Sequence, residues 1–463
     1  MAEQMPNVLA KIVAHKRDEV AKLKQQLPLK SFAGEVLPSQ HDFLAALKQS
    51  GPRFILECKK ASPSKGLIRA DFNLQELAQV YNRYADCISV LTDEKFFQGS
   101  YDYLRTMRSL TAKPLLHKDF IIDSYQIYLG RHCGADAVLL MLSVLDDAQY
   151  RELSAIAQQL NMTVLTEVSN EEETRRAVAL DAELIGINNR DLRDLSTNLA
   201  TSFQLAKLIP KDSTVVSESG IYTNQQVRHL ARVADAFLVG SSLMAEANLA
   251  LATRKLVLGE HKVCGLTRPQ DAEVAHSAGA YYGGLIFHPA SPRYITPEQA
   301  GIVQQAAPLQ YVGVFVNADI ELVAQLAKQL KLSAVQLHGE EDDSYLQKLR
   351  KMLDASCQIW KAYRVKDALP EFTPLADRIL LDAFHPKQHG GSGISFDWQI
   401  LTQQSSALPL MLAGGLSPDN CGTALTLPVA GLDFNSGLES APGCKDAVKI
   451  QSAFTKIREF HYE

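Results

Sequence analysis

The sequence lacks the features that mark secreted, zinc-binding and membrane-spanning proteins. Its seven cysteines are an odd number, lie far apart and include no C-x-x-C pair, which argues against a disulfide framework and a structural zinc site. Even the best apolar run, at 135–145, contains Asp136 and Ser143, and it is shorter than the roughly 18 residues of a membrane helix. The first residues mix charges into an amphipathic pattern and contain no apolar signal-peptide core. These absences predict a reduced, cytoplasmic protein.

An excess of charge of one sign is also missing. The chain has 47 basic and 52 acidic residues, a net charge of −5 and a pI near 6.2. This balance gives no electrostatic basis for binding nucleic acid or an anionic membrane. With 46% hydrophobic and 21% charged residues, the composition is that of an ordinary globular protein. The 463 residues accommodate two barrel domains of about 200–250 residues each.

The sequence does contain a series of short apolar segments separated by helix-length stretches, and it contains that series twice. The first eight segments lie at residues 54–60, 87–93, 114–120, 137–144, 163–169, 184–191, 214–220 and 236–243. The second eight lie at 262–267, 282–287, 311–317, 334–340, 358–365, 378–384, 408–416 and 431–438. Nearly continuous apolar strands that alternate with helices form parallel sheets buried on both faces. We therefore predict an α/β fold of two tandem (β/α)8 TIM barrels, residues 1–255 and 256–463, with an N-terminal helical extension.

Each series ends in a pair of glycine-rich segments. VVSESGI at 215–221 is followed by FLVGSSL at 237–243, and LMLAGGL at 410–416 is followed by GLDFNSGL at 431–438. In a (β/α)8 barrel, the loops after strands 7 and 8 form a phosphate site. Glycine lets backbone N–H groups approach the anion, and a helix N-terminus adds positive potential. Each half is therefore predicted to hold a phosphorylated small molecule.

Polar side chains end several of the segments in the first half, and these ends meet at one mouth in a parallel barrel. Glu57 and Lys59 are two residues apart and share one face of a strand, while Lys118 and Glu167 end two further strands. Two lysines and two carboxylates in one mouth suit proton transfer. The alternative is an ion-pair network that only stabilises the mouth. Residues 62–66 (SPSKG) are predicted to be a mobile loop that closes over a ligand.

Six ordered motifs in the first half resemble those of indole-3-glycerol phosphate synthase. They are ECKKASPSKG (57–66), LTDEKFFQGS (91–100), HKDFIID (117–123), TEVS (166–169), GINNRDL (186–192) and SESGI (217–221). The resemblance covers about residues 1–255. It implies ring closure, decarboxylation and dehydration of 1-(2-carboxyphenylamino)-1-deoxyribulose 5-phosphate, and it implies no cofactor.

The same resemblance implies roles for residues of the first half. Lys118 is the general acid, assisted by Lys59, and Glu167 is the general base, supported by Glu57. The implied substrate-binding residues are Phe120, Asn188, Arg190 and Ser219. Phe120 would stack on the aromatic ring, and Arg190 would bind the anthranilate carboxylate. The implied phosphate-binding residues are Ser62, Gly220, Gly240 and Ser241.

In the second half, Cys264 ends the first strand and Asp382 ends the sixth. Together they suit an Amadori rearrangement, which opens an aminoribose ring and needs an acid on the ring oxygen and a base at C2. Two alternatives stay open from the residues alone. A free cysteine is more often a small buried hydrophobe, and an aspartate after an apolar run is frequently a helix cap.

Six motifs of the second half resemble phosphoribosylanthranilate isomerase over about residues 256–463. They are KVCGLTR (262–268), GLIFHPASPRYI (284–295), VGVFVN (312–317), VQLHGEE (335–341), GGSG (390–393) and AGGL (413–416). This resemblance implies that Cys264 is the general base and Asp382 the general acid, with Arg293 on the anthranilate carboxylate and His338 in the pocket. The implied phosphate-binding residues are Gly391, Gly393, Gly414, Gly415, Asn435 and Ser436. A thiol with an ordinary pKa near 8.5 must have that pKa lowered to act as the base, so positive potential is expected near Cys264.

The two halves would catalyse consecutive steps, because the isomerase product is the synthase substrate. In one alternative, one half is inactive; in another, the protein is a phosphosugar sensor, which would have no use for proton-transfer groups. The expected partners are small phosphorylated anthranilates, without nucleic acid or membrane, and the chain is expected to be a monomer. His385 and His389 have a spacing compatible with a metal, but HxxxH in a glycine-rich loop without a third ligand is weak evidence, so no metal is expected.

Overall fold

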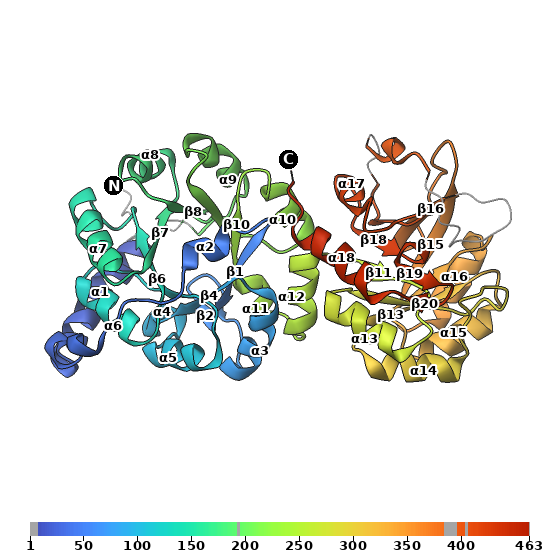
Figure 1. Cartoon of the computed structure of the whole chain (residues 1–463), viewed down its shortest axis with the longest axis horizontal. Helices are drawn as coiled ribbons and strands as arrows, with labels where there is room; N and C mark the ends of the chain where they lie inside the picture. Colours follow the sequence, from blue (N-terminus) through green and yellow to red (C-terminus); the bar gives the residue numbers. More distant parts are fainter. Residues whose placement is uncertain (1–7, 192–194, 384–395, 403–405, 463) are drawn as a thin grey trace, which may run out of the picture. The chain divides into compact units, whose positions relative to one another are not determined.

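The computed structural model describes residues 8–191, 195–383, 396–402 and 406–462. The chain divides into unit 1, Met1–Val257 with His461–Glu463, and unit 2, Leu258–Phe460. In each unit, eight parallel strands form a closed barrel surrounded by helices (Figure 1). The predicted fold class, two (β/α)8 barrels with an N-terminal helix, is therefore confirmed.

The barrel of unit 1 follows the predicted apolar segments, although most of its strands are shorter than those segments. Its strands are β1 (Arg53–Cys58), β4 (Cys87–Leu91), β5 (Leu115–Lys118), β6 (Ala137–Met141), β7 (Thr163–Val168), β8 (Leu184–Asn188), β9 (Thr214–Glu218) and β10 (Ala236–Val239). The main helices around them are α3 (Leu74–Tyr84), α5 (Tyr101–Leu110), α6 (Ser124–His132), α7 (Asp147–Gln159), α8 (Glu171–Ala179), α9 (Ala200–Leu205), α10 (Asn224–Leu230) and α12 (Leu249–Leu258). Shorter elements are α4 (Glu94–Phe97), α11 (Ser241–Met244), η3 (Ala206–Leu208), and the hairpin β2 (Ala61–Ser62) and β3 (Gly66–Leu67).

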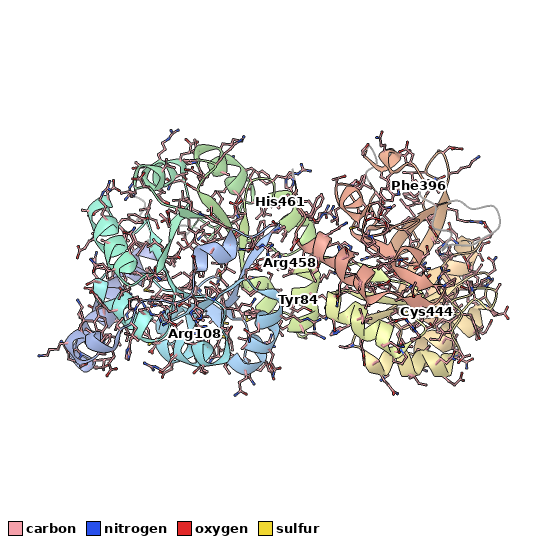
Figure 2. All side chains as sticks on the ribbon, in the orientation of Figure 1. Tyr84, Arg108, Phe396, Cys444, Arg458 and His461 are labelled. Carbon is pink, nitrogen blue, oxygen red and sulfur yellow. The ribbon has the colours of Figure 1, made fainter. Side chains whose placement is uncertain are left out.

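The strand register brings the polar strand ends of unit 1 to one rim. Leu91 pairs with Lys118, Met141 with Glu167, and Asn188 with Glu218. Because all these strands run parallel, their carboxyl ends open at the same mouth. At the opposite end, Asp136 precedes β6 and is buried, and Arg108 of α5 (labelled in Figure 2) reaches its Oδ2 atom at 2.7 Å.

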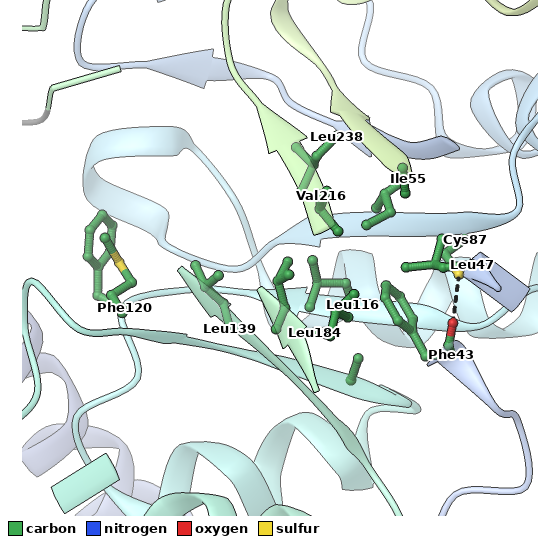
Figure 3. Packing of buried hydrophobic residues seen from close by; sticks show 14 of the residues in the cluster. Phe43, Leu47, Ile55, Cys87, Leu116, Phe120, Leu139, Leu184, Val216 and Leu238 are labelled. Atoms are coloured by element: carbon green, nitrogen blue, oxygen red, sulfur yellow. Dashed lines mark hydrogen bonds between the residues drawn. The ribbon is translucent and has the colours of Figure 1, made fainter. Parts of the chain in front are cut away.

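Four described elements precede β1 in unit 1, and one of them closes the barrel. They are α1 (Val8–Gln26), η1 (Leu29–Ser31), η2 (Ala33–Glu35) and α2 (Phe43–Leu47). Phe43 and Leu47 of α2 pack into a cluster with residues that begin strands, such as Cys87 and Leu184 (Figure 3). The Cys87 thiol donates a hydrogen bond to the Phe43 carbonyl at 3.7 Å. Helix α2 therefore seals the end of the barrel that lies opposite the polar rim.

Unit 2 has the same architecture. Its barrel strands are β11 (Lys262–Val263), β12 (Tyr282–Ile286), β13 (Gln310–Phe315), β14 (Ala334–Leu337), β15 (Gln358–Val365), β16 (Arg378–Ala383), β17 (Leu410–Leu412) and β18 (Gly431–Phe434). Its other described elements are α13 (Pro269–Ala278), α14 (Pro297–Ala306), α15 (Ile320–Gln329), α16 (Asp343–Met352), η4 (Trp398–Leu401), α17 (Cys421–Leu425), η5 (Ser436–Leu438), the hairpin β19 (Glu439–Ala441) and β20 (Cys444–Lys445), and α18 (Ala447–Arg458). Within the described parts of both units, no helix has the length and apolarity to cross a membrane.

Candidate active sites

One cavity at the rim of unit 1 is lined by every residue predicted for that half. These residues are Glu57, Lys59, Ser62, Lys118, Phe120, Glu167, Asn188, Arg190, Ser219, Gly220, Gly240 and Ser241. They come from the ends of six strands and the loops that follow them. The parallel register accounts for this convergence, because residues far apart in sequence end neighbouring strands at one level.

Two ammonium groups in this cavity are paired with three carboxylates. Lys118 Nζ lies 2.7 Å from Glu218 Oε2 and 3.3 Å from Glu167 Oε2. Lys59 Nζ lies 2.6 Å from Glu57 Oε1. Asn188 Nδ2 donates to Glu167 Oε1 at 3.1 Å. The charges are close enough for the protonation state of each group to depend on the others.

The protonation preferences of these groups diverge. Burial alone would lower the pKa of Lys118, but Glu218, Glu167 and Glu57 outweigh burial and hold that pKa above its ordinary value. Burial raises the pKa of Glu218 to about 7, with Glu167 adding to the rise and Lys118 opposing it. Burial would also raise the pKa of Glu57, but Lys59 and Lys118 lower it below its ordinary value. The site therefore contains a persistent proton donor and a carboxylate that titrates near neutrality.

An apolar wall faces these charges. Phe97 of α4 and Phe120 lie with ring centroids 6.1 Å apart. Val8, Leu9 and Ile12 of α1 line the same cavity. The N-terminal helix, which the sequence indicated only as an extension, is thus part of the pocket. A planar aromatic group fits against such a wall, because aromatic side chains bind flat apolar surfaces well.

The segment predicted to be a mobile loop is a hairpin whose tip reaches across the cavity mouth. β2 and β3 pair in antiparallel fashion around Pro63, Ser64 and Lys65. Arg190 donates from Nη1 to Ser64 Oγ at 2.8 Å. Lys65 Nζ lies 5.3 Å from the ring centroid of Tyr222 and 3.4 Å from its hydroxyl. The hairpin therefore covers the pocket in this structure.

Several glycines of the glycine-rich loops have positive φ angles, which glycine adopts more easily than residues with a Cβ atom. Gly220 has φ 80°, and Gly414 and Gly415 have φ 86° and 65°. A Cβ atom on Gly414 would lie 2.8 Å from the backbone nitrogen of Ala383, closer than carbon and nitrogen atoms approach. These positions bring the backbone close to their cavities, as phosphate-binding loops require.

A second cavity, at the rim of unit 2, is lined by every described residue predicted for that half. These residues are Cys264, Arg293, His338, Asp382, Gly414, Gly415, Asn435 and Ser436. Gly391 and Gly393, together with His385 and His389, lie outside the described residues. Cys264 directly follows β11 and Asp382 lies in β16, and both line this cavity.

A buried polar chain lies behind Cys264. Lys262 Nζ contacts Asp433 Oδ2 at 2.8 Å and Gln336 Oε1 at 3.0 Å. Gln336 Nε2 lies 3.0 Å from His338 Nδ1, and His338 Nε2 lies 3.4 Å from Asp382 Oδ2. The chain links β11, the strand that directly precedes Cys264, to Asp382 on β16.

The expectation that the Cys264 thiol has a lowered pKa is wrong for this structure. Burial is the largest influence and raises the pKa of Cys264 above its ordinary value, and Asp433 raises it further. Lys262 and Lys445 act in the opposite direction without outweighing burial. The positive potential that the sequence could not locate therefore comes first from Lys262, two residues before the thiol.

Arg293 is held by an acidic partner that the sequence did not indicate. Its Nε and Nη2 atoms contact the Glu439 carboxylate at 2.9 and 2.8 Å. Lys445 Nζ also reaches Glu439 at 2.8 Å and the side chain of Asn435 at 3.0 Å. This network from the β19–β20 hairpin fixes the guanidinium at the cavity edge.

Four residues of these sites had no predicted role: Glu218, Lys262, Gln336 and Glu439. Glu218 ends its strand inside the SESGI motif, so its position at the rim could be predicted from the sequence. Its ion pair with Lys118 could not be predicted. Lys262 lies in the KVCG motif on the same strand face as Cys264, which was a usable signal. Among the described residues, no group of three or more His, Cys, Asp or Glu side chains could hold a metal ion.

Comparison with known proteins matches each half of the chain to an enzyme family. A family model for indole-3-glycerol phosphate synthase matches residues 9–256, and one for N-(5'phosphoribosyl)anthranilate isomerase matches residues 261–456. The tryptophan biosynthesis protein TrpCF of Vibrio cholerae is 57% identical over 99% of this chain and 97% of its own length. The protein of the same name from Salmonella typhi is 55% identical over 98% of this chain and 100% of its own length. The chain therefore belongs to the bifunctional family of tryptophan biosynthesis that joins an indole-3-glycerol phosphate synthase, here unit 1, to a phosphoribosylanthranilate isomerase, here unit 2.

Proposed function

We propose that unit 2 converts N-(5-phosphoribosyl)anthranilate to 1-(2-carboxyphenylamino)-1-deoxyribulose 5-phosphate with Asp382 as the acid and Cys264 as the base. Asp382 protonates the ribose ring oxygen as the ring opens, and Cys264 removes the proton from C2. The position of both groups on one cavity supports these roles. Of the charges that face the thiol, Lys262 favours its thiolate form.

The remaining residues of unit 2 bind the two ends of this substrate. Arg293, held by Glu439, offers its guanidinium to the anthranilate carboxylate. His338 contributes to the pocket wall beside Asp382. The phosphate is bound by backbone N–H groups and small side chains of Gly391, Gly393, Gly414, Gly415, Asn435 and Ser436, of which the first two rest on the sequence motif alone.

In unit 1, Lys118 is the general acid of ring closure. As the aromatic carbon attacks the carbonyl, the oxygen develops negative charge, and a protonated ammonium beside it stabilises that charge and donates the proton. Lys118 suits this step because its three neighbouring carboxylates keep it protonated. Loss of carbon dioxide restores aromaticity without an electron-sink cofactor. Lys118 and Lys59 then assist the departure of water, with Glu167 as the base and Glu57 as the carboxylate that orients Lys59 at 2.6 Å.

The substrate of unit 1 is held by the wall and loops around these charges. Phe120 stacks on the anthranilate ring, and Arg190 pairs with its carboxylate. Asn188 and Ser219 bind the hydroxyl groups of the sugar chain. The phosphate lies at Ser62, Gly220, Gly240 and Ser241, on the same cavity.

The observation that carries this proposal is that each barrel gathers its predicted residues around one cavity. A coupled assay tests it by following the isomerase substrate to the indole product in the wild type, in Lys118→Ala and in Cys264→Ala. We expect Lys118→Ala to lose synthase turnover while the first step continues and the substrate still binds. We expect Cys264→Ala to lose the first step while added intermediate is still converted. Near-normal rates in either variant, or loss of both activities from one substitution, would refute the assignment.

We propose further that the chain acts as a cytoplasmic monomer. All seven cysteines are free thiols, which suits a reducing compartment. Because the two barrels are covalently joined, two separate chains need not associate to bring both activities together. Light scattering on the purified protein should give the mass of one chain, and the mass of two chains would contradict the monomer.

A further inference from the structure

The polar chain behind Cys264 crosses the inside of the second barrel from β11 to β16. Lys262, Gln336, His338 and Asp382 have exposures of 0%, 1%, 7% and 4%. Their contacts measure 3.0 Å from Lys262 Nζ to Gln336 Oε1, 3.0 Å from Gln336 Nε2 to His338 Nδ1, and 3.4 Å from His338 Nε2 to Asp382 Oδ2. A buried chain of this kind has few ways to satisfy all of its donors and acceptors.

The chemistry of the side chains sets the direction of each contact. An ammonium group has three donors and no acceptor, so Gln336 must present its carbonyl oxygen to Lys262. The amide nitrogen of Gln336 then faces His338, and an amide nitrogen only donates. His338 Nδ1 must therefore accept, which leaves it without a proton. A neutral imidazole carries one proton, and this proton must be on Nε2.

We infer that Lys262 and Gln336 are positioning residues that fix His338 as its Nε2–H tautomer and so aim a hydrogen-bond donor at Asp382. The amide cannot turn over, because its nitrogen would then meet the Lys262 ammonium, donor against donor. The Asp382 carboxylate is itself held in place, since its Oδ1 accepts from the Ala383 backbone N–H at 2.8 Å. The tautomer of His338 rests on the hydrogen bonds of Lys262 and Gln336. His338 Nε2 makes no hydrogen bond in this structure and lies 3.4 Å from Asp382 Oδ2, so its donation to Asp382 is inferred from this distance. The consequence for the reaction rests on the proposed acid role of Asp382.

The tautomer matters because Asp382 changes charge in the proposed reaction. After it has given its proton to the ring oxygen, Asp382 is a carboxylate, and an N–H donor beside it stabilises that form. The other tautomer would present the lone pair of Nε2 to Asp382. That lone pair would accept the proton that the substrate needs, and the general acid would be lost.

Replacing Gln336 by glutamate tests the inference with almost no change of shape. The carboxylate still accepts from Lys262, but it presents an acceptor to His338, which must then carry a proton on Nδ1. The nitrogen-15 spectrum of labelled protein reports the state of His338, whose signals are identified by their absence in His338→Asn. We expect the Nε2–H tautomer in the wild type and the neutral Nδ1–H tautomer in Gln336→Glu.

The kinetic prediction is confined to one activity. In Gln336→Glu, isomerase kcat should fall by about 10- to 100-fold with a smaller change in KM, because the loss concerns proton transfer rather than binding. Synthase activity of the same chain should be unchanged, and the fluorescence of Trp360 and Trp398, both in unit 2, checks that the substituted barrel is folded. Gln299→Glu is the matched control, because Gln299 is an exposed capping residue of α14 that glutamate replaces well.

The possible failures are distinguishable. An Nδ1–H tautomer in the wild type would overturn the inference without any variant. A changed tautomer in Gln336→Glu with normal isomerase kcat would overturn its role in the reaction. Full isomerase activity in Asp382→Asn would instead refute the proposed role of Asp382 as the general acid. The tautomer of His338 could still be determined from the nitrogen-15 spectrum. Lys262→Met provides a second route, because it frees the amide to turn over and should produce a mixture of both tautomers.

Discussion

Replacing Lys16 by methionine is expected to destabilise unit 1 by about 3–5 kcal/mol, because it leaves buried carboxylates without their counter-charge. Lys16 of α1 is fully buried, and its Nζ lies 2.8 Å from Asp93 Oδ2, 2.8 Å from Asp119 Oδ1 and 2.9 Å from Glu19 Oε1. Asp93 and Asp119 are 0% and 2% exposed, so water cannot replace the ammonium. Methionine keeps most of the volume of the side chain, so the expected loss is mainly electrostatic.

The pH dependence of this loss has a definite sign. Burial would lower the pKa of Lys16, but Asp119 and Asp93 raise it above its ordinary value. Burial would raise the pKa of Asp119, but His117 and Lys16 lower it below its ordinary value. The stability that Lys16 contributes is therefore fully present below an unfolded pKa near 10.4 and is lost as pH rises through its folded pKa. The contribution of Asp119 is present above an unfolded pKa of about 3.9 and is lost as pH falls through its folded pKa. The difference between wild type and variant should therefore shrink at high pH, as Lys16 loses its proton, and at low pH, as the unpaired carboxylates of the variant gain protons.

Urea unfolding can follow the two units separately. Both tryptophans, Trp360 and Trp398, belong to unit 2, so indole fluorescence reports that unit alone. Loss of synthase activity reports unit 1, and we expect only this transition to move in Lys16→Met. Lys24→Met is the control on the same helix. Lys24 forms a 2.6 Å ion pair with Asp123, but its side chain is 45% exposed, so this ion pair contributes about 0–1 kcal/mol to stability. Equal effects of the two substitutions would refute the argument from burial.

Three further outcomes are expected. Burial raises the pKa of Glu218 to about 7, so Glu218 gains a proton and loses its ion pair with Lys118 as pH falls through that value. The synthase rate of the wild type should therefore change near pH 7, and the rate of Glu218→Gln should not depend on pH there. The burial that raises the pKa of Cys264 should make its alkylation by iodoacetamide slow at neutral pH, and Lys262→Met should slow it further; rapid alkylation at pH 7, read by mass spectrometry, would contradict this. Because each barrel closes on its own strands, fragments 1–257 and 258–463 should each fold and keep one activity, as circular dichroism and separate assays would show.

The positions of the rim residues could be predicted from the sequence because the carboxyl ends of all strands in a parallel barrel lie at the same rim. Lys118 and Glu167 are 49 residues apart, yet they lie 3.3 Å apart because β5 and β7 end at the same rim. The apolar segments alone carry this information. The same reasoning gave Cys264 and Asp382 a shared cavity.

The partners of buried charges could not be predicted in this way. Lys262 donates hydrogen bonds to Gln336 and Asp433, which are 74 and 171 residues away in the sequence. Nothing in the KVCG motif indicates these partners. Lys16 did leave a signal, because it lies on the helical stripe of Leu9, Ile12 and Val20, all buried, where an apolar residue would be expected. A lysine on an apolar stripe indicates a buried counter-charge, but its identity depends on which loops the helix meets.

The depth of a lysine along its strand separates the two chemistries that this fold supports here. Lys118 is the last residue of β5, and its side chain is 13% exposed at the rim, where an ammonium can give a proton to a bound molecule. Lys262 is the first residue of β11, and its side chain is 0% exposed, so it can act only through the groups that it contacts. Carbon–carbon bond formation in unit 1 needs a proton donor at the substrate, whereas the isomerisation in unit 2 needs a base and an acid held in the right protonation states. In the proposed mechanisms, a lysine at the end of its strand therefore reacts with the substrate, whereas a lysine at the start of its strand sets the protonation state of its neighbours.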